Sequence, residues 1–414
     1  MLVCHGEIAR DRPPVQHLTS FYLWIAVGGV IGGAVSGLIA PTISPGFVEY
    51  PLAIAAGAAL LPRHPNGPMP RLWADAAFAV AVGALVVGAL VTATVLSFQD
   101  VVVHAIAFGP AALLCYSAVR RRLRFGLALG AVLLAGVLPI GLSEQPLFAG
   151  RDFFGTSRVT SVNATGTHIL YSGSIVHNEQ TSSGPNHDDP LTYYTRQGPL
   201  GDVFRSTSSL SARWNVGVIG LGAGAMACYA TPQQHWTFYE IDPLVARLAK
   251  DPAMFTYYSD CLRGNGRVIL GDGRISMAAA PDHSYNVIVI DAFGSDVVPI
   301  HLLTREAMDL YRSKLASGGI IVLNVSNQYV DLQGVVAAVA HAEGMTCLAR
   351  DDSNIPPGDA AAGRFASKWM VIAGPDADLS ELSRTPGWAQ IAPTPGAQPW
   401  TDDFSNLISV IRWR

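Results

Sequence analysis

The chain has 414 residues, which exceeds one ordinary domain and predicts two or three. Half of the residues are hydrophobic (50%) and only 14% are charged, which indicates a membrane component. The formal net charge of −4 gives no electrostatic reason to expect a nucleic-acid partner.

The five cysteines show no metal-ligand spacing and are scattered along the chain, at positions 4, 115, 228, 261 and 347. We expect reduced thiols in apolar surroundings, with no disulfide framework and no metal site. Glu7, Arg10 and Asp11 precede the first apolar run, so we expect no cleavable signal peptide.

Residues 1–146 contain five apolar stretches, at about 20–40, 48–62, 72–97, 101–119 and 125–143. The first, third and fifth are long enough to cross a hydrocarbon core, which takes about 20 residues. The other two are shorter or more polar, and they could be tilted, buried or re-entrant. The dense small residues favour close helix packing in lipid. The pattern predicts a membrane domain with about five transmembrane helices over 1–146.

From residue 151 the pattern changes to strands. Residues 157–175 alternate in polarity around a turn at 163–166, which predicts a β-hairpin module over 151–205. The polar stretch 177–190 that follows is typical of a loop lying over a site.

The stretch from Trp214 to Asp242 predicts a nucleotide-binding unit. A buried strand at 216–219 leads into a glycine turn, and a second strand at 237–239 ends on Glu240. The alanine-rich segment after the glycines can begin a helix, and strand, glycine turn, helix, strand and acid form the first half of a doubly wound sheet. Gly220, Gly222 and Gly224 let the backbone approach a ligand, and Glu240 can accept the hydroxyls of a ribose.

The next two strands also end on acids. Residues 267–270 lead to Asp272, and residues 285–290 lead to Asp291. Ligands of open α/β sheets bind outside the carboxyl ends of the strands, so Glu240, Asp272 and Asp291 should converge there. An NAD pyrophosphate fits the glycine pattern but not three carboxylates. S-adenosylmethionine, or its decarboxylated form, fits better because it carries a positive centre.

Further strands at 320–325, 346–349 and 368–373 alternate with helices at 243–250, 304–316 and 330–343. This order predicts a Rossmann-like, seven-stranded sheet of the class I methyltransferase type over 206–414. The expected fold is therefore an α-helical membrane domain followed by a small β module and an α/β domain.

The motifs of residues 151–414 resemble the spermidine synthase family of polyamine aminopropyltransferases, and within it the membrane-fused bacterial branch. The matching segments are GLGAG at 220–224, EID at 240–242, GDGR at 271–274, DAFGSDVVPIHLLT at 291–304, LTYYTRQGPLGDVF at 191–204 and WTDDFSNLISVIR at 400–412. The resemblance implies aminopropyl transfer from decarboxylated S-adenosylmethionine to an amine, in a multi-pass protein of the bacterial inner membrane.

The resemblance also implies roles for single residues. Glu240 would bind the ribose, and Asp272 would accept from the adenine amino group with Gly273 leaving room for the ring. Asp291 would orient the attacking amine and help to take its proton. Candidates for contacts to the cofactor tail or to the acceptor are Gln180, Tyr193 and Tyr194.

The chain departs from the family at the acceptor side. The usual two acids of the gate loop lie three residues apart, whereas here they are Asp291 and Asp296. The segment from Asn324 to Asn327 lacks the acid expected near a second ammonium group. Asp402 and Asp403 are the candidates to replace it.

Two alternatives to aminopropyl transfer stay open at this stage. One is a methyltransferase that uses intact S-adenosylmethionine, and the other is a membrane sensor that binds a nucleoside or polyamines without turnover. The expected partners are a small amine and the lipid bilayer, with no nucleic acid, and a homodimer is an open alternative.

Arginines fall in alternate loops, near residues 10–12, 63–71 and 120–124, which places the N-terminus in the cytoplasm. Five crossings would then put the α/β domain outside, away from a cofactor made in the cytosol. We expect this domain in the cytoplasm instead, with one weak apolar segment failing to cross.

Overall fold

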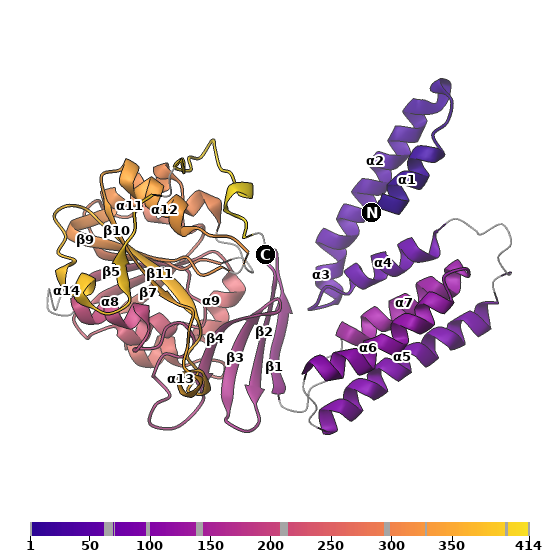
Figure 1. Ribbon diagram of the computed structural model, residues 1–414, viewed down its shortest axis with the longest axis horizontal. Coiled ribbons are helices and arrows are strands. Elements are labelled where there is room, and N and C mark those ends of the chain that lie inside the picture. The colour runs from indigo at the N-terminus through magenta and orange to yellow at the C-terminus, as the bar shows by residue number, and fades with distance from the viewer. Residues whose placement is uncertain are drawn as a thin grey trace. The chain divides into compact units, whose positions relative to one another are not determined.

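The computed structural model describes residues 2–61, 69, 71–96, 100–137, 144–207, 214–293, 299–327, 329–393 and 396–412. The chain divides into two compact units, Met1–Glu144 and Gln145–Arg414 (Figure 1).

In the first unit, the regular elements of the described residues are helices. Its elements are α1 (Leu2–Arg10), η1 (Val15–His17), α2 (Leu18–Ala34), η2 (Val35–Ile39), α3 (Ala40–Ile43), α4 (Glu49–Ala59), α5 (Leu72–Val95), α6 (Asp100–Ser117) and α7 (Arg122–Val137). Helices therefore occupy all five apolar stretches. Two segments of the described chain, Val15–Ile43 and Leu72–Ala93, are long and apolar enough to cross a membrane by length and composition.

Small residues allow helices of this unit to pack closely. A Cβ atom built on Gly126 of α7 would lie 2.7 Å from the backbone nitrogen of Ala59 at the end of α4. One charged pair also joins helices: Arg124 Nε of α7 lies 2.7 Å from Asp75 Oδ1 of α5, and Asp75 is 1% exposed. A buried carboxylate of this kind needs such a partner, because an unpaired buried charge is costly.

The second unit begins with a four-stranded sheet in the order β1-β2-β3-β4. Its strands are β1 (Glu144–Arg151), β2 (Thr156–Val162), β3 (Thr167–Ser172) and β4 (Ile175–Thr181). The β2–β3 turn lies at 163–166, where the sequence indicates one. The module is larger than a hairpin, because β1 and β4 add a strand on each side.

The main sheet has eight strands, in the order β12-β10-β11-β9-β8-β5-β6-β7. They are β5 (Asn215–Ile219), β6 (His235–Glu240), β7 (Gly266–Leu270), β8 (Tyr285–Ile290), β9 (Leu315–Asn324), β10 (Thr346–Asp352), β11 (Ser367–Ala373) and β12 (Trp388–Gln390). The expectation of seven strands is wrong, because the sheet has an eighth strand, β12, at its edge. This three-residue strand lies in a Pro- and Gly-rich connector without strand periodicity, and its pairing to β10 defines it.

Strands β5 to β9 pair parallel with one another, whereas β11 pairs antiparallel with both β9 and β10. Helices cover both faces (Figure 1). One face packs against α10 (Gly273–Ala278), α11 (Arg305–Lys314) and α12 (Gln333–Ala342). The other packs against α8 (Pro199–Thr207), α9 (Pro243–Lys250) and α14 (Ser380–Arg384). The remaining elements are α13 (Pro357–Ala361) and the short turns η3 to η6 (Ala225–Tyr229, Tyr257–Cys261, Ile300–Leu302 and Ile408–Val410).

The chain reverses its direction across the sheet between β5 and β8. From β5 it proceeds to β6 and β7 on one side, and from β8 it proceeds to β9 on the other. Such a reversal leaves a crevice at the carboxyl ends of the two central strands, where ligands of open α/β sheets bind. The fold thus directs attention to Gly220 and Asp291, which follow these strands.

Candidate active site

A pocket of about 240 Å³ lies at the carboxyl ends of β5, β6 and β8. Its described lining includes four carboxylates, those of Glu240, Asp242, Asp272 and Asp291, and it includes no lysine or arginine. The β module contributes Phe154 and Tyr171, among other residues, to the wall. This charge pattern suits a ligand with a positive centre and opposes a pyrophosphate.

Gly220 lets the two central strand ends approach each other. Its φ is +99°, and a Cβ atom there would lie 2.4 Å from the carbonyl oxygen of Asp291. Any other residue would push the end of β8 away. Gly222 also lines the pocket, whereas Gly224 does not and instead faces Tyr258. The alanine-rich segment after the glycines forms only the short 3₁₀ turn η3.

Glu240 is buried and holds the glycine turn. Its Oε2 accepts a hydrogen bond from the backbone N–H of Leu221 at 2.9 Å, and its Oε1 accepts from the backbone N–H of Asp242 at 2.9 Å. Burial raises the pKa of this carboxyl, and the backbone donors oppose that rise. The residue that caps α9 is Asp242, so Glu240 is not a helix-capping acid. Its remaining lone pairs can accept ribose hydroxyls in the pocket.

Asp272 has a role in the fold as well as a place in the pocket. Its Oδ1 caps α10 by accepting from the N–H of Ile275 at 2.9 Å, and its Oδ2 lies 2.8 Å from His301 Nε2. Gly273 is required by packing, because a Cβ atom there would lie 2.4 Å from a methyl carbon of Ile219. His301 belongs to the family-like segment 291–304, but no local pattern predicts its contact with Asp272, 29 residues earlier in the chain.

Asp291 is a buried acid at the end of β8 with two side-chain hydrogen bonds. Its Oδ2 accepts from the Tyr194 hydroxyl at 2.6 Å, and its Oδ1 accepts from Asn324 Nδ2 at 2.9 Å. Burial raises the pKa of this carboxyl to about 7, and the two hydrogen bonds limit the rise. A carboxylate with a pKa near neutrality, in a cleft, is suited to act as a general base.

The tyrosine pair reaches this centre from the loop before α8. The rings of Tyr193 and Tyr194 lie 4.5 Å apart between centroids, and both line the pocket. The Tyr193 hydroxyl donates to the carbonyl of His177 at 2.7 Å. Burial raises the pKa of both hydroxyls, so both stay protonated and act as donors.

Gln180 does not line the pocket. Its Oε1 accepts from the backbone N–H of Thr256 at 2.8 Å, and its Nε2 donates to Thr256 Oγ1 and to the carbonyl of His187, both at 2.9 Å. The amide therefore joins β4 to the segment before η4. The expected loop over 177–190 is therefore wrong at its start, because β4 extends to Thr181 and carries Gln180.

Asp402 and Asp403 are likewise absent from the pocket lining. Asp402 forms a two-point ion pair with Arg274 at 2.7 Å for each contact, and it also accepts from Thr304 Oγ1 at 2.7 Å. These contacts connect the C-terminal segment to α10 and hold Asp402 outside the pocket in which an amine acceptor would bind. Asp296 lies outside the described residues.

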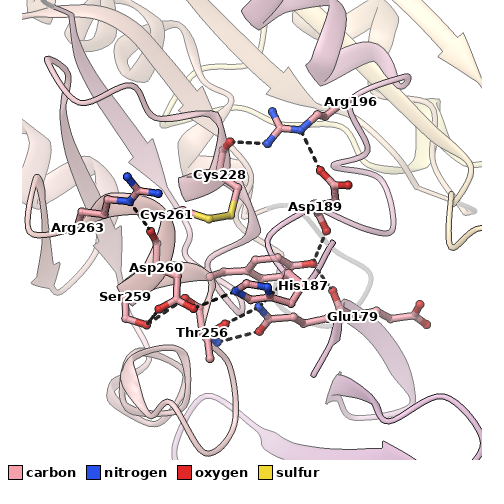
Figure 2. Close-up of a disulfide and its surroundings, with 12 residues drawn as sticks. Glu179, His187, Asp189, Arg196, Cys228, Thr256, Ser259, Asp260, Cys261 and Arg263 are labelled. Carbon is pink, nitrogen blue, oxygen red and sulfur yellow. Dashed lines mark hydrogen bonds and ion pairs between the residues drawn. A yellow bond between two sulfur atoms is a disulfide. The ribbon is translucent and has the colours of Figure 1, made fainter. Parts of the chain in front are cut away.

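Cys228 and Cys261 form a disulfide, which corrects the expectation of reduced thiols (Figure 2). It joins η3, directly after the glycine turn, to η4. The 33-residue separation carries no signal, because the fold alone brings the two turns together. Cys4, Cys115 and Cys347 are free, as expected.

The chain has curated relatives but matches no family model. It is 34% identical over 112 residues to a polyamine aminopropyltransferase of Vibrio vulnificus (strain CMCP6), a match that covers 26% of this chain and 36% of that protein. It is 30% identical over 122 residues to a probable polyamine aminopropyl transferase of Bifidobacterium longum (strain NCC 2705), covering 29% of this chain and 25% of that protein. The chain thus spans about a third and a quarter of these relatives.

A probable spermidine synthase from Corynebacterium glutamicum ATCC 13032 is a solved structure with a TM-score of 0.46 and 17% identity, covering 65% of this chain and 99% of that one. The spermidine synthase from Thermotoga maritima gives a TM-score of 0.40 at 11% identity, covering 65% of this chain and 85% of that one. The sequence matches confirm the resemblance that the motifs indicate: the chain is similar to the polyamine aminopropyltransferases.

Proposed function

We propose that the second unit transfers an aminopropyl group from decarboxylated S-adenosylmethionine to an amine acceptor. The main support for this proposal is the pocket at the carboxyl ends of β5 and β8, where the chain reverses its direction across the sheet. Four carboxylates line this pocket, and its described lining contains no lysine or arginine. Decarboxylation removes the negative charge from the tail of the cosubstrate, so the ligand becomes more positive. The curated relatives with polyamine aminopropyltransferase names support the same reaction.

The residues fit this cosubstrate. All four of Glu240, Asp272, Gly220 and Gly222 line the pocket. In the proposed complex Glu240 would accept the ribose hydroxyls, Asp272 would accept from the adenine amino group, and the glycines would leave the backbone open to the ligand. The cosubstrate supplies a carbon that is activated by its bond to a positively charged sulfur. Tyr193 and Tyr194 form the wall nearest to Asp291, where an incoming amine would bind.

The proposed chemistry at Asp291 is proton removal. An amine enters as an ammonium ion with a pKa of about 10, and it needs its lone pair to attack carbon. Asp291 takes the proton, the new C–N bond forms, and the C–S electron pair stays on sulfur as a neutral thioether. Because the pKa of Asp291 is raised to about 7, its proton affinity lies closer to that of the amine. The remaining rate enhancement would come from in-line positioning.

The acceptor is proposed only as an amine. Asn324, and not a carboxylate, faces Asp291 from the end of β9. The described pocket therefore offers no second acid at that position for a diamine's far ammonium group. We propose Asp296, the second acid of the gate loop, as a counter-ion to the acceptor.

The choice of cosubstrate can be tested by calorimetry. We expect decarboxylated S-adenosylmethionine to bind at least about tenfold more tightly than the intact form, which is about 1.4 kcal/mol. The reason is that the tail carboxylate of the intact form meets acids without a compensating cation. Methylthioadenosine and S-adenosylhomocysteine form the matched control, since both have neutral sulfur and differ in the tail. Tighter binding of the intact form would favour methyl transfer.

We also propose that the first unit is an integral membrane domain of a bacterial inner-membrane protein, and that the second unit faces the cytoplasm. Two segments of the described chain are long and apolar enough to cross a membrane. An even number of crossings would return the chain to the side of the N-terminus. The cytosolic origin of an adenosyl cosubstrate favours the same side. The disulfide opposes this placement, because disulfides persist in oxidising compartments and are reduced in the cytosol.

The redox state of the cysteine pair in cells tests the side. In a chain whose Cys4, Cys115 and Cys347 are replaced by alanine, we expect acid-trapped cells to yield both remaining thiols free for alkylation. A reporter fused after Arg414 should also be active only in the cytoplasm. Thiols that react only after reduction, together with a reporter active outside, would place the second unit on the oxidising side.

A further inference from the structure

Thr192, directly before the tyrosine pair, holds an unusual backbone conformation. Its φ is +60°, a region that β-branched residues rarely adopt, and the residue is fully buried. Two hydrogen bonds hold it: its N–H donates to the carbonyl of Gly363 at 2.7 Å, and its carbonyl accepts from the N–H of Phe365 at 3.1 Å. Such a conformation persists only where the surroundings determine it. The segment 363–365 therefore sets the direction in which the chain enters Tyr193 and Tyr194.

Arg364 fixes that segment in turn. Its Nη2 contacts both carboxylate oxygens of Asp352, at 2.9 and 2.7 Å, and its Nη1 contacts Asp359 at 2.7 Å. Asp352 ends β10 and is 8% exposed, so this pair is anchored on the sheet itself. The planar fork of arginine fits a carboxylate at two points, which a lysine cannot do.

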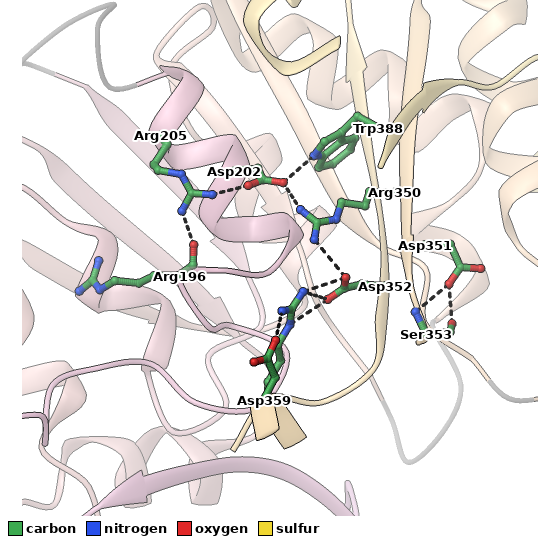
Figure 3. Close-up of polar contacts among 10 residues, drawn as sticks. Arg196, Asp202, Arg205, Arg350, Asp351, Asp352, Ser353, Asp359 and Trp388 are labelled. Carbon is green, nitrogen blue, oxygen red and sulfur yellow. Dashed lines mark hydrogen bonds and ion pairs between the residues drawn. The ribbon is translucent and has the colours of Figure 1, made fainter. Parts of the chain in front are cut away.

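The same network holds the other end of the tyrosine segment (Figure 3). Arg350 joins Asp352, at 3.1 Å, to Asp202 of α8, and Asp202 also accepts from Trp388 Nε1 of β12 at 3.0 Å. We call Asp202, Arg350, Asp352 and Arg364 the ion-pair clamp. The clamp holds the chain at Asp202 directly and at Thr192 through the neighbours of Arg364. The loop that carries Tyr194 lies between these two positions.

We propose that Arg364 is a positioning residue, which acts through Thr192 to hold the Tyr194 hydroxyl on Asp291. The clamp lies outside the pocket, since none of its four residues lines it. The effect of Arg364 on turnover rests on the proposed aminopropyl transfer. The effect of Arg364 on the Tyr194–Asp291 hydrogen bond does not depend on that proposal. The groups that face Asp291 are the hydroxyl of Tyr194, the nearby Tyr193 and the amide of Asn324, all neutral. Burial has the largest effect on the pKa of Asp291, and the Tyr194 hydroxyl opposes it together with the Asn324 amide.

The test measures the pKa of Asp291 in the full chain. The protein is labelled with ¹³C at its aspartate carboxyl groups, and NMR spectra recorded over a range of pH give the titration curve. The signal missing from Asp291→Asn identifies the residue. The Tyr194 hydrogen bond lowers the pKa of Asp291, so Tyr194→Phe should raise that pKa by about one unit. Arg364→Gln should raise it in the same direction by about half as much. Arg312→Gln, which removes the ion pairs from α11 to Asp309 and Glu343 outside the pocket, is the matched control and should leave the pKa of Asp291 unchanged.

The outcomes separate a positioning role from a structural one. If Arg364→Gln lowers the melting temperature but leaves the Asp291 titration as in the wild type, the proposal fails. If that variant does not fold, Arg364→Lys keeps one ion pair, and an intermediate shift is expected from it. A shift of the acid limb of kcat against pH by the same amount would link the clamp to transfer. A titration shift without any detectable transfer would keep the clamp and overturn the proposed function.

Discussion

Asp291→Asn is expected to reduce turnover by about 10²-fold or more, the usual contribution of a positioned general base. The substitution keeps the shape of the side chain but removes its negative charge and its ability to take a proton. The hydrogen bond from Tyr194 can persist to the amide oxygen, and the apolar residues of β8 still pack the core. The affinity for methylthioadenosine, measured by calorimetry, should therefore change by less than about threefold, within roughly 0.6 kcal/mol.

The pH dependence gives this prediction a second measurement. The base form of Asp291 is required, so kcat of the wild type should rise with pH through about 7 and then level. Asp291→Asn should lose that limb, while the exposed control Asp309→Asn should keep both rate and limb. Near-full turnover of Asp291→Asn with any accepted amine would show the base assignment to be wrong. An unfolded variant would show that the acid has a structural role.

Glu240→Ala is expected to weaken binding of an adenosyl ligand by about 1–3 kcal/mol, the scale of lost hydrogen bonds to a charged group. That range corresponds to roughly five- to 150-fold in Kd. Glu240→Gln, which keeps the shape, separates the lost charge from a disturbed glycine turn, because alanine leaves the N–H of Leu221 without its acceptor. Unchanged affinity in both variants, or tight NAD binding by the wild type, would contradict an adenosyl site at this edge.

Local patterns predicted the centre of the sheet well. The apolar runs that form β5, β6 and β8 are buried parallel strands, and β7 is a more exposed edge strand beside β6. The acids that follow β6, β7 and β8 lie at one edge because parallel strands share their carboxyl ends. Pocket lining by Glu240, Asp272 and Asp291 therefore follows from periodicity and topology. The pattern also predicts Gly220, because the turn that follows β5 needs a positive φ, which glycine adopts without strain.

What the sequence could not predict depends on contacts between distant segments. Asp402 looked available for an acceptor, but its partner Arg274 is 128 residues away. The disulfide, the His301 contact to Asp272 and the clamp around Asp352 are of the same kind. Asn324 looked like a missing acid, whereas its amide donates to Asp291. No local pattern encodes these partners, because tertiary packing alone brings them together.

The most direct test of the proposed transfer is product identification by mass spectrometry. The full chain in detergent would be given decarboxylated S-adenosylmethionine with an isotopically labelled aminopropyl group, together with a mixture of monoamines, diamines and polyamines. We predict an amine that has gained the labelled aminopropyl group, formed in equal amount with methylthioadenosine, and both products formed at least about 10²-fold more slowly by Asp291→Asn. Transfer of a methyl group from intact S-adenosylmethionine, or ligand binding with no product from either cosubstrate, would contradict the account.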